Sequence, residues 1–368
     1  MNIEFNNLSI PISKQKNILN DFKNLINHQD YILGKKVYKL EAELSKFTKS
    51  KYCISTSSGT DALLIALLSL NLKKGSEVLT PAFSYISSAE VIIRAGCKPV
   101  FVDIDHNTMN ICMKDLTKKI NKRSSAIIAV SLFGQISDVA KLKKLKKKFN
   151  ISIIEDAAQS FGAQYKATRS CNVFDIGCTS FFPSKTLGCF GDGGAIFTNK
   201  KLIAERCNYI RKHGQKKKYY YELNGLNARL DTIQSIVLLE KLKNFKTQLK
   251  KRNFLASRYF FYLSNEKNIR FVKLMKNHSC VYPIFNILTK KRDGLAKFLK
   301  KNKIPTRIYY PYSLNKQKIF KKYNNNTTPI SEKVSKEILS LPFHINLKES
   351  EIKFITDNIK KFFKDKKN

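Results

Sequence analysis

The sequence predicts an α/β protein with a mostly parallel β-sheet sandwiched by helices and a smaller C-terminal α+β domain. Over the first two-thirds of the chain, short apolar segments alternate with segments of helical periodicity, which is typical of such a sheet. The 368 residues are enough for a large domain and a smaller one. Hydrophobic residues make up 43% of the chain and aromatic residues 11%, which favours a packed core over disorder.

Each predicted strand is a short apolar run followed by a segment of helical periodicity. The predicted strands are KYCIST (51–56), EVLTPA (77–82), KPVFVDID (98–105), AIIAVSL (126–132) and ISIIED (151–156). The predicted helices cover 58–70, 88–96, 113–121 and 138–149. Repeated strand and helix units of this length indicate a parallel sheet covered on both faces. In such sheets, ligands bind at the carboxyl ends of the strands.

The C-terminal third of the chain has a different character. Long helices dominate after about residue 200, and RLDTIQSIVLLEKLKNF (229–245) is the most regular of them. From about residue 265, short strands and helices indicate a smaller α+β unit. We therefore expect a large domain over 1–240, which includes an N-terminal helical segment, and a small domain over 241–368.

Basic residues greatly outnumber acidic ones, with 68 Lys and Arg against 28 Asp and Glu. In KLKKLKKKF (141–149), Leu142, Leu145 and Phe149 recur at spacings of three and four, which predicts a buried stripe and a lysine-covered solvent face. Lysines occur along the whole chain and are not gathered into one patch with aromatics. A lysine-rich solvated surface is therefore favoured over a specific nucleic-acid site, although weak binding to polyanions would follow from the charge.

Cysteine spacing and the N-terminal segment bear on the cellular location. The eight cysteines form no CxxC pair and no metal-type spacing, so we expect reduced thiols and no metal site. The start, MNIEFNNLSI, lacks the basic and apolar regions of a signal peptide. The longest apolar runs, such as ALLIALL (62–68), are too short to span a bilayer. We expect a cytoplasmic protein without membrane association.

Polar and aromatic residues follow several of the predicted strands. In STSSGTDALL, Gly59 and Thr60 open a helix whose free N–H groups suit a phosphate, although an ordinary N-cap is the simpler interpretation. In ISIIEDAAQSFGA, Asp156 ends an apolar strand and needs either a capping or ion-pair partner or a cationic ligand nitrogen. In PAFSYISS, Phe83 and Tyr85 are core residues, unless one stacks on a flat ring.

Lys185 differs in its surroundings from the other lysines of the chain. Its flanks, SFFPS and TLGCFG, contain no charged residue, and glycines nearby allow close backbone approach. A lysine that forms a Schiff base must give up its proton, which desolvation encourages. A phosphate cup, an aromatic, a carboxylate and then this lysine are the parts that a pyridoxal phosphate site requires. Each signal is weak alone, and together they predict that cofactor.

With these motifs in place, the chain resembles the sugar-nucleotide aminotransferase family known as the DegT/DnrJ/EryC1/StrS group. Nearly the whole chain carries the resemblance. The matching stretches are DYILGKKVYKLEAEL, SSGTDALLIAL, PAFSYISSAE, VFVDID, EDAAQSFGA, SFFPSK, GDGGAIFTN, RKHGQ, GLNARLDTIQ and SLPFH. The resemblance implies the type I fold of pyridoxal phosphate enzymes, with a seven-stranded, mostly parallel sheet.

The resemblance also implies roles for residues around the cofactor ring. Lys185 would hold the cofactor as a Schiff base and later move a proton between substrate and cofactor. Asp156 would keep the pyridine nitrogen protonated, and Gln159 would contact the ring hydroxyl. Tyr85 would stack on the ring.

A phosphate cup is implied as well, together with a dimer. Gly59, Thr60 and Ser180 would bind the cofactor phosphate. Asn227 matches an asparagine that the family supplies from a second subunit, which implies a homodimer with shared active sites. His213, in RKHGQ, matches a recurring family feature, and we expect it to be structural rather than catalytic.

Two longer stretches point to one subgroup of the family. RSCNVFDIGCTSFFPSKTLGCFGDGGAIFTN and YYPYSLNKQ are closest to enzymes that aminate UDP-2-acetamido-2-deoxy-3-oxo-glucuronate for surface polysaccharides such as O-antigen and lipopolysaccharide. Arg229 is the candidate for the substrate carboxylate because its planar fork suits bidentate pairing, although surface arginines are common. In a strand, Arg229 would point to the same side as Asn227.

The resemblance supplies further contacts to the sugar nucleotide. The implied residues are Gln29, Tyr31, Ser184, Tyr309 and Tyr310. Two of them depart from the subgroup, which has Gly in place of Gln29 and His in place of Tyr309. Tyrosine keeps a hydrogen-bonding group but carries no positive charge near neutral pH, so these changes bear on the identity of the sugar more than on the chemistry.

The expected reaction is ping-pong transamination. Glutamate would convert the cofactor to pyridoxamine phosphate, which would then aminate a keto-sugar nucleotide. The alternatives are amination at the 3- or 4-position of another UDP- or dTDP-linked keto-deoxyhexose, a pyridoxamine-dependent sugar dehydratase, a non-catalytic regulatory homologue, and a basic binding protein. Dehydratases of this fold replace the lysine with histidine, so Lys185 argues against that alternative.

Overall fold

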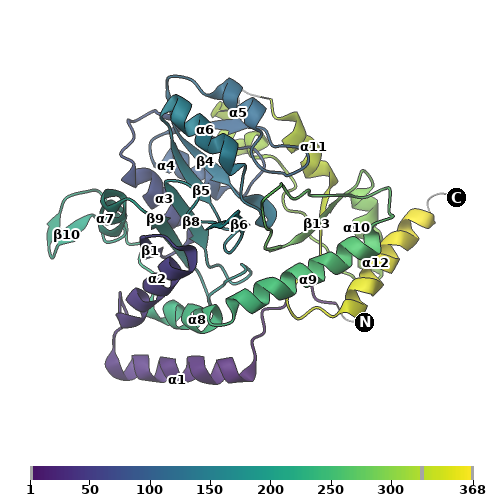
Figure 1. Cartoon of the computed structure of the whole chain (residues 1–368), viewed down its shortest axis with the longest axis horizontal. Helices are drawn as coiled ribbons and strands as arrows, with labels where there is room; N and C mark the ends of the chain where they lie inside the picture. Colours follow the sequence, from purple (N-terminus) through teal and green to yellow (C-terminus); the bar gives the residue numbers. More distant parts are fainter. Residues whose placement is uncertain (1–2, 324–326, 366–368) are drawn as a thin grey trace.

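A seven-stranded β-sheet forms the centre of the computed structural model, which describes residues 3–323 and 327–365 (Figure 1). Across the sheet the strands lie in the order β1-β9-β8-β5-β4-β2-β3. Their bounds are Tyr52–Thr56 (β1), Glu77–Pro81 (β2), Lys98–Val102 (β3), Ser124–Val130 (β4), Ser152–Asp156 (β5), Ile176–Ser180 (β8) and Gly194–Thr198 (β9).

Six of the seven strands run in one direction. Parallel pairing joins β8, β5, β4, β2 and β3, whereas β9 pairs antiparallel with both β8 and β1. The sheet is therefore mostly parallel, as the sequence predicts. Helices cover it, and their bounds are Lys35–Thr48 (α2), Gly59–Ser69 (α3), Ser87–Arg94 (α4), Met113–Lys119 (α5), Val139–Phe149 (α6) and Lys201–Ile210 (α7).

The five predicted strands and four predicted helices all occur, with ends that move by a few residues at most. The predicted helix over 229–245 is wrong at both ends. Helix α8 covers only Thr232–Leu242, and α9 then begins at Phe245 and ends at Leu263. The buried Ala228 and Leu230 belong to an extended segment before α8, since Ala228 accepts a hydrogen bond from Ser57 N. Periodicity of apolar residues does not distinguish that extended segment from the first turn of a helix.

A second, smaller sheet lies near the C-terminal end of the chain. It is antiparallel, in the order β12-β13-β14, and packs with α9, α10 and α12. The bounds are Arg270–Phe271 (β12), Phe285–Leu288 (β13), Ile338–Leu341 (β14), Arg292–Lys301 (α10) and Glu349–Lys364 (α12). Helix α9 spans the two parts, because Phe245 packs in the core beside the large sheet and Tyr259 packs in the small one. The division at residue 240 stays a prediction.

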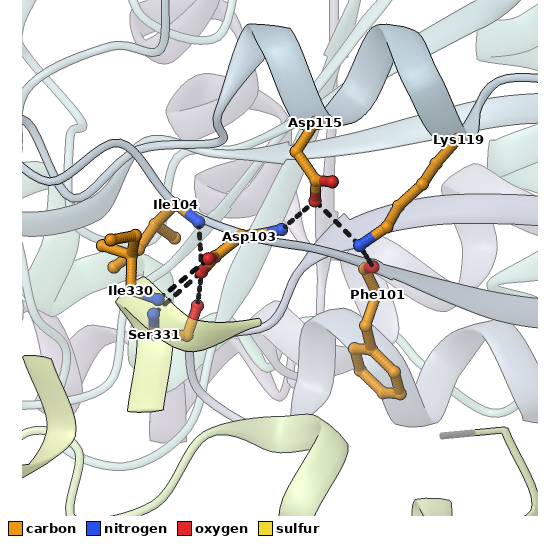
Figure 2. Close-up of polar contacts among 7 residues, drawn as sticks. All are labelled: Phe101, Asp103, Ile104, Asp115, Lys119, Ile330 and Ser331. Atoms are coloured by element: carbon orange, nitrogen blue, oxygen red, sulfur yellow. Dashed lines mark hydrogen bonds and ion pairs between the residues drawn. The ribbon is translucent and has the colours of Figure 1, made fainter. Parts of the chain in front are cut away.

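Asp103 ties the large sheet to helix α11 (Pro329–Glu337), as Figure 2 shows. Its carboxylate accepts hydrogen bonds from Ile330 N at 2.9 Å and from Ser331 N at 2.8 Å. These are orphan N–H groups of the first helical turn, and the α11 N-cap residue, Thr328, makes no side-chain cap of its own. Asp103 therefore caps a helix that begins more than two hundred residues later in the chain.

The remaining elements lie at the periphery. They are α1 (Ile12–His28), the two-residue strands β6 (Gln164–Tyr165) and β7 (Thr168–Arg169), and the hairpin of β10 (Gln215–Lys217) and β11 (Tyr220–Tyr221). The hairpin projects from the body at the left of Figure 1. Leu142 and Leu145 of α6 are buried, Phe149 is partly buried, and most lysines of the helix are exposed, so the predicted stripe is confirmed at the two leucines. Among the described helices, none combines the length and apolar character needed to cross a membrane.

Candidate active site

Most of the predicted cofactor residues lie at one edge of the large sheet. Asp156 and Ser180 end the parallel strands β5 and β8, and Gly59 follows β1. Tyr85 follows β2 by a few residues. Because the carboxyl ends of parallel strands meet at the same edge, the topology collects these residues where α/β sheets bind ligands.

The proposed phosphate cup is the N-terminus of helix α3. Ser58 is the N-cap, and its hydroxyl accepts a hydrogen bond from Asp61 N at 3.0 Å. Gly59 and Thr60 are the first two residues of the helix, where backbone N–H groups lack intrahelical partners. A Cβ on Gly59 would lie 2.6 Å from Ser180 Cβ, so only glycine allows the helix to approach Ser180 this closely. The N-cap and the phosphate-site interpretations are thus compatible, since Ser58 leaves these N–H groups free for a ligand.

Lys185 lies in the loop between β8 and β9. A hydrogen bond from Phe181 N to Gly193 O at 2.7 Å closes the base of this loop, and Lys185 N donates to Phe182 O at 2.8 Å. Burial lowers the pKa of the Lys185 ammonium group, and the negative charge of Asp156 partly offsets that effect. A neutral amine is therefore more accessible here than at a solvated lysine.

Asp156 carries a buried carboxylate with spare hydrogen-bonding capacity. It is 7% exposed, and its Oδ1 accepts a hydrogen bond from Ala158 N at 3.1 Å. Burial raises the pKa of this carboxyl, against the opposing effects of the Ala158 hydrogen bond and the Lys185 charge. A cationic nitrogen placed beside it would relieve the cost of burying the charge.

Gln159 is held by two neighbours. Its Oε1 accepts a hydrogen bond from Phe133 N at 2.9 Å, and its Nε2 donates to the Tyr310 hydroxyl at 3.2 Å. Sequence reasoning missed Phe133, because its contribution is a backbone N–H. Phe133 adopts a left-handed conformation with φ 56°, which nothing in the sequence LFGQ predicts for a phenylalanine.

The two aromatics after β2 differ in their environments. Phe83 is fully buried and packs edge-on against Tyr310, with ring centroids 6.0 Å apart. Tyr85 is 59% exposed, and its ring lies 6.2 Å from that of Tyr310. Phe83 is thus a core residue, whereas Tyr85 has a free face, and its stacking role stays a prediction.

A second group of predicted residues lies around the extended segment before α8. Asn227 and Arg229 point to the same side, because Arg229 Nη2 donates to Asn227 Oδ1 at 2.6 Å. Tyr31 adjoins this segment, since its carbonyl accepts from Thr232 N at 3.1 Å. Gln29 ends α1 in a left-handed conformation with φ 55°, a geometry that glycine adopts without strain.

The last three predicted residues have separate places. Ser184 is exposed, one residue before Lys185 in the loop after β8. The Tyr309 ring lies 6.3 Å from that of Phe5. His213 is exposed with φ 62° and donates its backbone N–H to Leu226 O at 2.9 Å, which agrees with a role in shaping the turn. The roles of these residues toward ligands stay predictions.

The described residues fit pyridoxal phosphate at each of its polar groups. Free N–H groups at α3, with Ser180 beside them, suit the phosphate. The buried Asp156 suits a protonated ring nitrogen, and the desolvated Lys185 suits a carbonyl partner. The fold and this site together define a pyridoxal phosphate-dependent enzyme of fold type I.

Comparison with known proteins gives the family. Residues 13–360 match the model of the DegT/DnrJ/EryC1/StrS aminotransferase family. The chain belongs to this family and is a pyridoxal phosphate-dependent sugar-nucleotide aminotransferase.

Relatives of known name cover most of the chain. The UDP-2-acetamido-2-deoxy-3-oxo-D-glucuronate aminotransferase of Pseudomonas aeruginosa is 42% identical over 90% of this chain and 92% of its own length. A protein of Geobacillus stearothermophilus named pleiotropic regulatory protein is 36% identical over 99% of both chains. Among solved structures, S. venezuelae DesV, in complex with a ketimine intermediate, has a TM-score of 0.95 at 28% identity and covers 98% of both chains.

Proposed function

We propose that this enzyme converts UDP-2-acetamido-2-deoxy-3-oxo-glucuronate to the 3-amino sugar nucleotide, with glutamate as amino donor, for surface polysaccharides such as lipopolysaccharide O-antigen. The observation that carries the proposal is the 42% identity to the Pseudomonas aeruginosa enzyme of that name over most of both chains. Arg229 adds chemical support, because its guanidinium is a group that suits a substrate carboxylate and it lies beside Asn227, to which it donates a hydrogen bond.

The residues of the site divide the work of transamination. Pyridoxal phosphate supplies an electron sink that stabilises negative charge on the substrate carbon. The Asp156 carboxylate would keep the ring nitrogen of the cofactor protonated, and the N-terminus of helix α3 would bind its phosphate. The Lys185 amine, whose pKa burial lowers, accepts a proton from the donor carbon and returns one to the sugar carbon.

We further propose a homodimer in which the second copy covers an apolar surface beside Lys185. Five large apolar side chains there are each about half exposed: Tyr31, Ile32, Phe182, Phe190 and Ile233. Tyr31, Ile32, Ile233 and Phe190 lie on neighbouring segments, because Ile32 pairs with Asp231 and the Phe190 backbone bonds the Gln234 amide. Phe182 lies in the same loop as Phe190, between β8 and β9. A contiguous exposed apolar patch is typical of an interaction site.

The β10–β11 hairpin supports the same dimer. Three consecutive tyrosines, 219–221, are exposed on it, and it projects from the body in Figure 1. The hairpin is continuous with the segment of Asn227, which pairs with Lys212. A projecting arm of this kind would reach a neighbouring subunit and bring Asn227 to its site. Size-exclusion chromatography with light scattering should give twice the chain mass, and Ile233→Asp should shift it toward the monomer.

The substrate proposal is tested with a panel of UDP- and dTDP-linked keto sugars, with and without a C6 carboxylate. Wild-type enzyme should give most amino-sugar product from the UDP-3-oxo-uronate. Arg229→Ala should lower kcat/KM for the uronate by about 100-fold and leave uncharged sugars little changed, since a charge-assisted pair is lost. Equal losses on both kinds of sugar would show that Arg229 does not bind the carboxylate.

Turnover itself distinguishes the enzyme from a regulatory or polyanion-binding protein. Purified protein supplied with cofactor should gain the visible absorbance of lysine-bound pyridoxal phosphate, and Lys185→Ala should abolish it. The Geobacillus relative's name makes this control necessary. Binding to a polyanion that persists in Lys185→Ala, without any visible absorbance in the wild type, would contradict the proposal.

A further inference from the structure

The orientation of the Gln159 side-chain amide is set by its neighbours. A backbone N–H can only donate, so the atom that faces Phe133 N at 2.9 Å must be the amide oxygen. The amide nitrogen then faces the Tyr310 hydroxyl, 3.2 Å away. Gln159 is only 8% exposed, so water competes poorly for these partners.

The ring of Tyr310 is held in turn by aromatic neighbours. Phe83, which is fully buried, meets it edge-on, and the centroid of the Tyr85 ring lies 6.2 Å from that of Tyr310. Burial raises the pKa of the Tyr310 hydroxyl, and the nearby Asp156 charge raises it further, so this group stays neutral over the working pH range. A neutral hydroxyl oxygen can accept a hydrogen bond from Gln159 at every such pH.

Within residues 3–323 and 327–365, the Gln159 amide nitrogen donates to Tyr310 alone, so one amide hydrogen is left for a ligand. The amide nitrogen carries two hydrogens, and Tyr310 takes one of them. The other hydrogen is on the same nitrogen, and Gln159 itself follows Asp156 by three residues in the chain. We propose that Tyr310 is a positioning residue for the cofactor: it fixes the Gln159 amide so that its second N–H donates to the ring hydroxyl oxygen of pyridoxal phosphate. The inference rests on the proposed role of Gln159 beside the cofactor ring.

The physical consequence is a change in the basicity of the lysine–cofactor linkage. A negatively charged ring oxygen attracts the proton of the linkage nitrogen. A donor that bonds this oxygen withdraws part of its charge, so the oxygen holds that proton less strongly. With the donor in place, the linkage loses its proton at a lower pH. Freeing the Gln159 amide weakens the donor and should shift the titration of the linkage to higher pH.

The test is a pH titration of the visible absorbance of the holoenzyme. Tyr310→Phe removes only the hydroxyl, and the midpoint should rise by about 0.5 to 1 pH unit, the scale of one hydrogen bond. Gln159→Leu should raise it at least as much. The exposed Tyr312 provides the matched control, and Tyr312→Phe should leave the midpoint where it is in the wild type.

The double variant decides whether Tyr310 works through Gln159. In Tyr310→Phe with Gln159→Leu, the midpoint should equal that of Gln159→Leu alone, because the hydroxyl has no amide left to position. Additive shifts would show that Tyr310 acts on the cofactor independently, and an unmoved midpoint in Tyr310→Phe would overturn the proposal. Tyr310→Gln, which keeps an acceptor oxygen, is the second variant and should stay nearer the wild type than Tyr310→Phe.

Failure of this inference is distinguishable from failure of the proposed function. A holoenzyme that absorbs in the visible and aminates the UDP-3-oxo-uronate, but whose midpoint ignores Tyr310, contradicts only the positioning role. A holoenzyme with the expected midpoints that rejects the uronate contradicts only the substrate.

Discussion

Glu155 and Asp156 are adjacent carboxylates at the end of β5, and their environments differ sharply. Successive strand residues point to opposite faces of a sheet, so the two side chains enter different surroundings. Glu155 is fully buried and accepts hydrogen bonds from three serine hydroxyls and one backbone N–H. Asp156 is 7% exposed and accepts one from Ala158 N.

The two carboxylates differ in how many hydrogen-bond donors the chain supplies to each of them. Burial raises the pKa of both carboxyl groups. At Glu155 the chain supplies four donors that offset the cost of burial, whereas at Asp156 it supplies one donor and the Lys185 charge, which leaves room for the proposed cofactor nitrogen. Asp103 resembles Glu155, because it is buried and occupied by donors from α11 (Figure 2). All three carboxylates are buried, so Asp156 differs from Glu155 and Asp103 in the number of hydrogen-bond donors that the chain supplies to it.

The largest expected effect is on catalysis at Asp156. Asp156→Asn keeps an acceptor for Ala158 N but removes the charge that would pair with the ring nitrogen. We expect kcat/KM to fall by about 10³-fold, the scale of one lost electrostatic partner in an active site. Steady-state assays with the UDP-3-oxo-uronate measure it. Glu155→Gln is the matched control, and its activity per folded site should stay within about threefold of the wild type, within the usual scatter of mutational effects away from ligands.

The free energy of unfolding should depend more on Glu155 than on Asp156, the reverse of the order expected for catalysis. Glu155→Ala leaves three hydroxyls and one backbone N–H without their acceptor, and the free energy of unfolding should fall by about 3 kcal/mol. Urea denaturation of the cofactor-free proteins gives the value. If Asp156→Ala cost as much as Glu155→Ala, donor number would not be what separates the two residues.

A smaller loss is expected at Asp103. Asp103→Ala removes the cap of α11 and should lower the free energy of unfolding by about 2 kcal/mol. Asp103→Asn keeps an acceptor oxygen and should cost less than Asp103→Ala. Urea denaturation at neutral pH checks both, and activity per folded site should persist, since Asp103 lies outside the proposed cofactor residues.

The smallest effect concerns pH. Burial raises the pKa of the Asp156 carboxyl in the folded state. The contribution of Asp156 protonation to folding stability is therefore fully present below the ordinary pKa of about 3.9 and is lost as pH rises through the pKa of the folded state. Cofactor-free Asp156→Asn should therefore match the wild type in stability at low pH and become slightly more stable toward neutral pH. A variant that instead becomes less stable than the wild type as pH rises would show that a partner within the chain stabilises the Asp156 carboxylate.

Much of the fold follows from local patterns. The alternating strands and helices up to residue 156 can be predicted from short stretches of sequence, because the spacing of apolar residues within each stretch indicates which face of the element is buried. The helix predicted over 229–245 is too long, since residues 229–231 continue an extended segment in which Ala228 accepts a hydrogen bond from Ser57 N. Long-range pairing of that kind leaves no periodic signal in the sequence.

For the site, the residue types can be predicted from local sequence: an uncharged setting for Lys185, a carboxylate after an apolar strand, and small residues at the start of α3. The tertiary structure is needed to see which of the site's polar groups already have hydrogen-bond partners within the chain. The four donors to Glu155, the Phe133 N–H on Gln159 and the Tyr310 hydroxyl come from segments up to 151 residues away. Hydrogen-bond partners must be close in space, but they can lie any number of residues apart along the chain. Which buried polar groups remain available to a ligand is therefore known only from the folded structure.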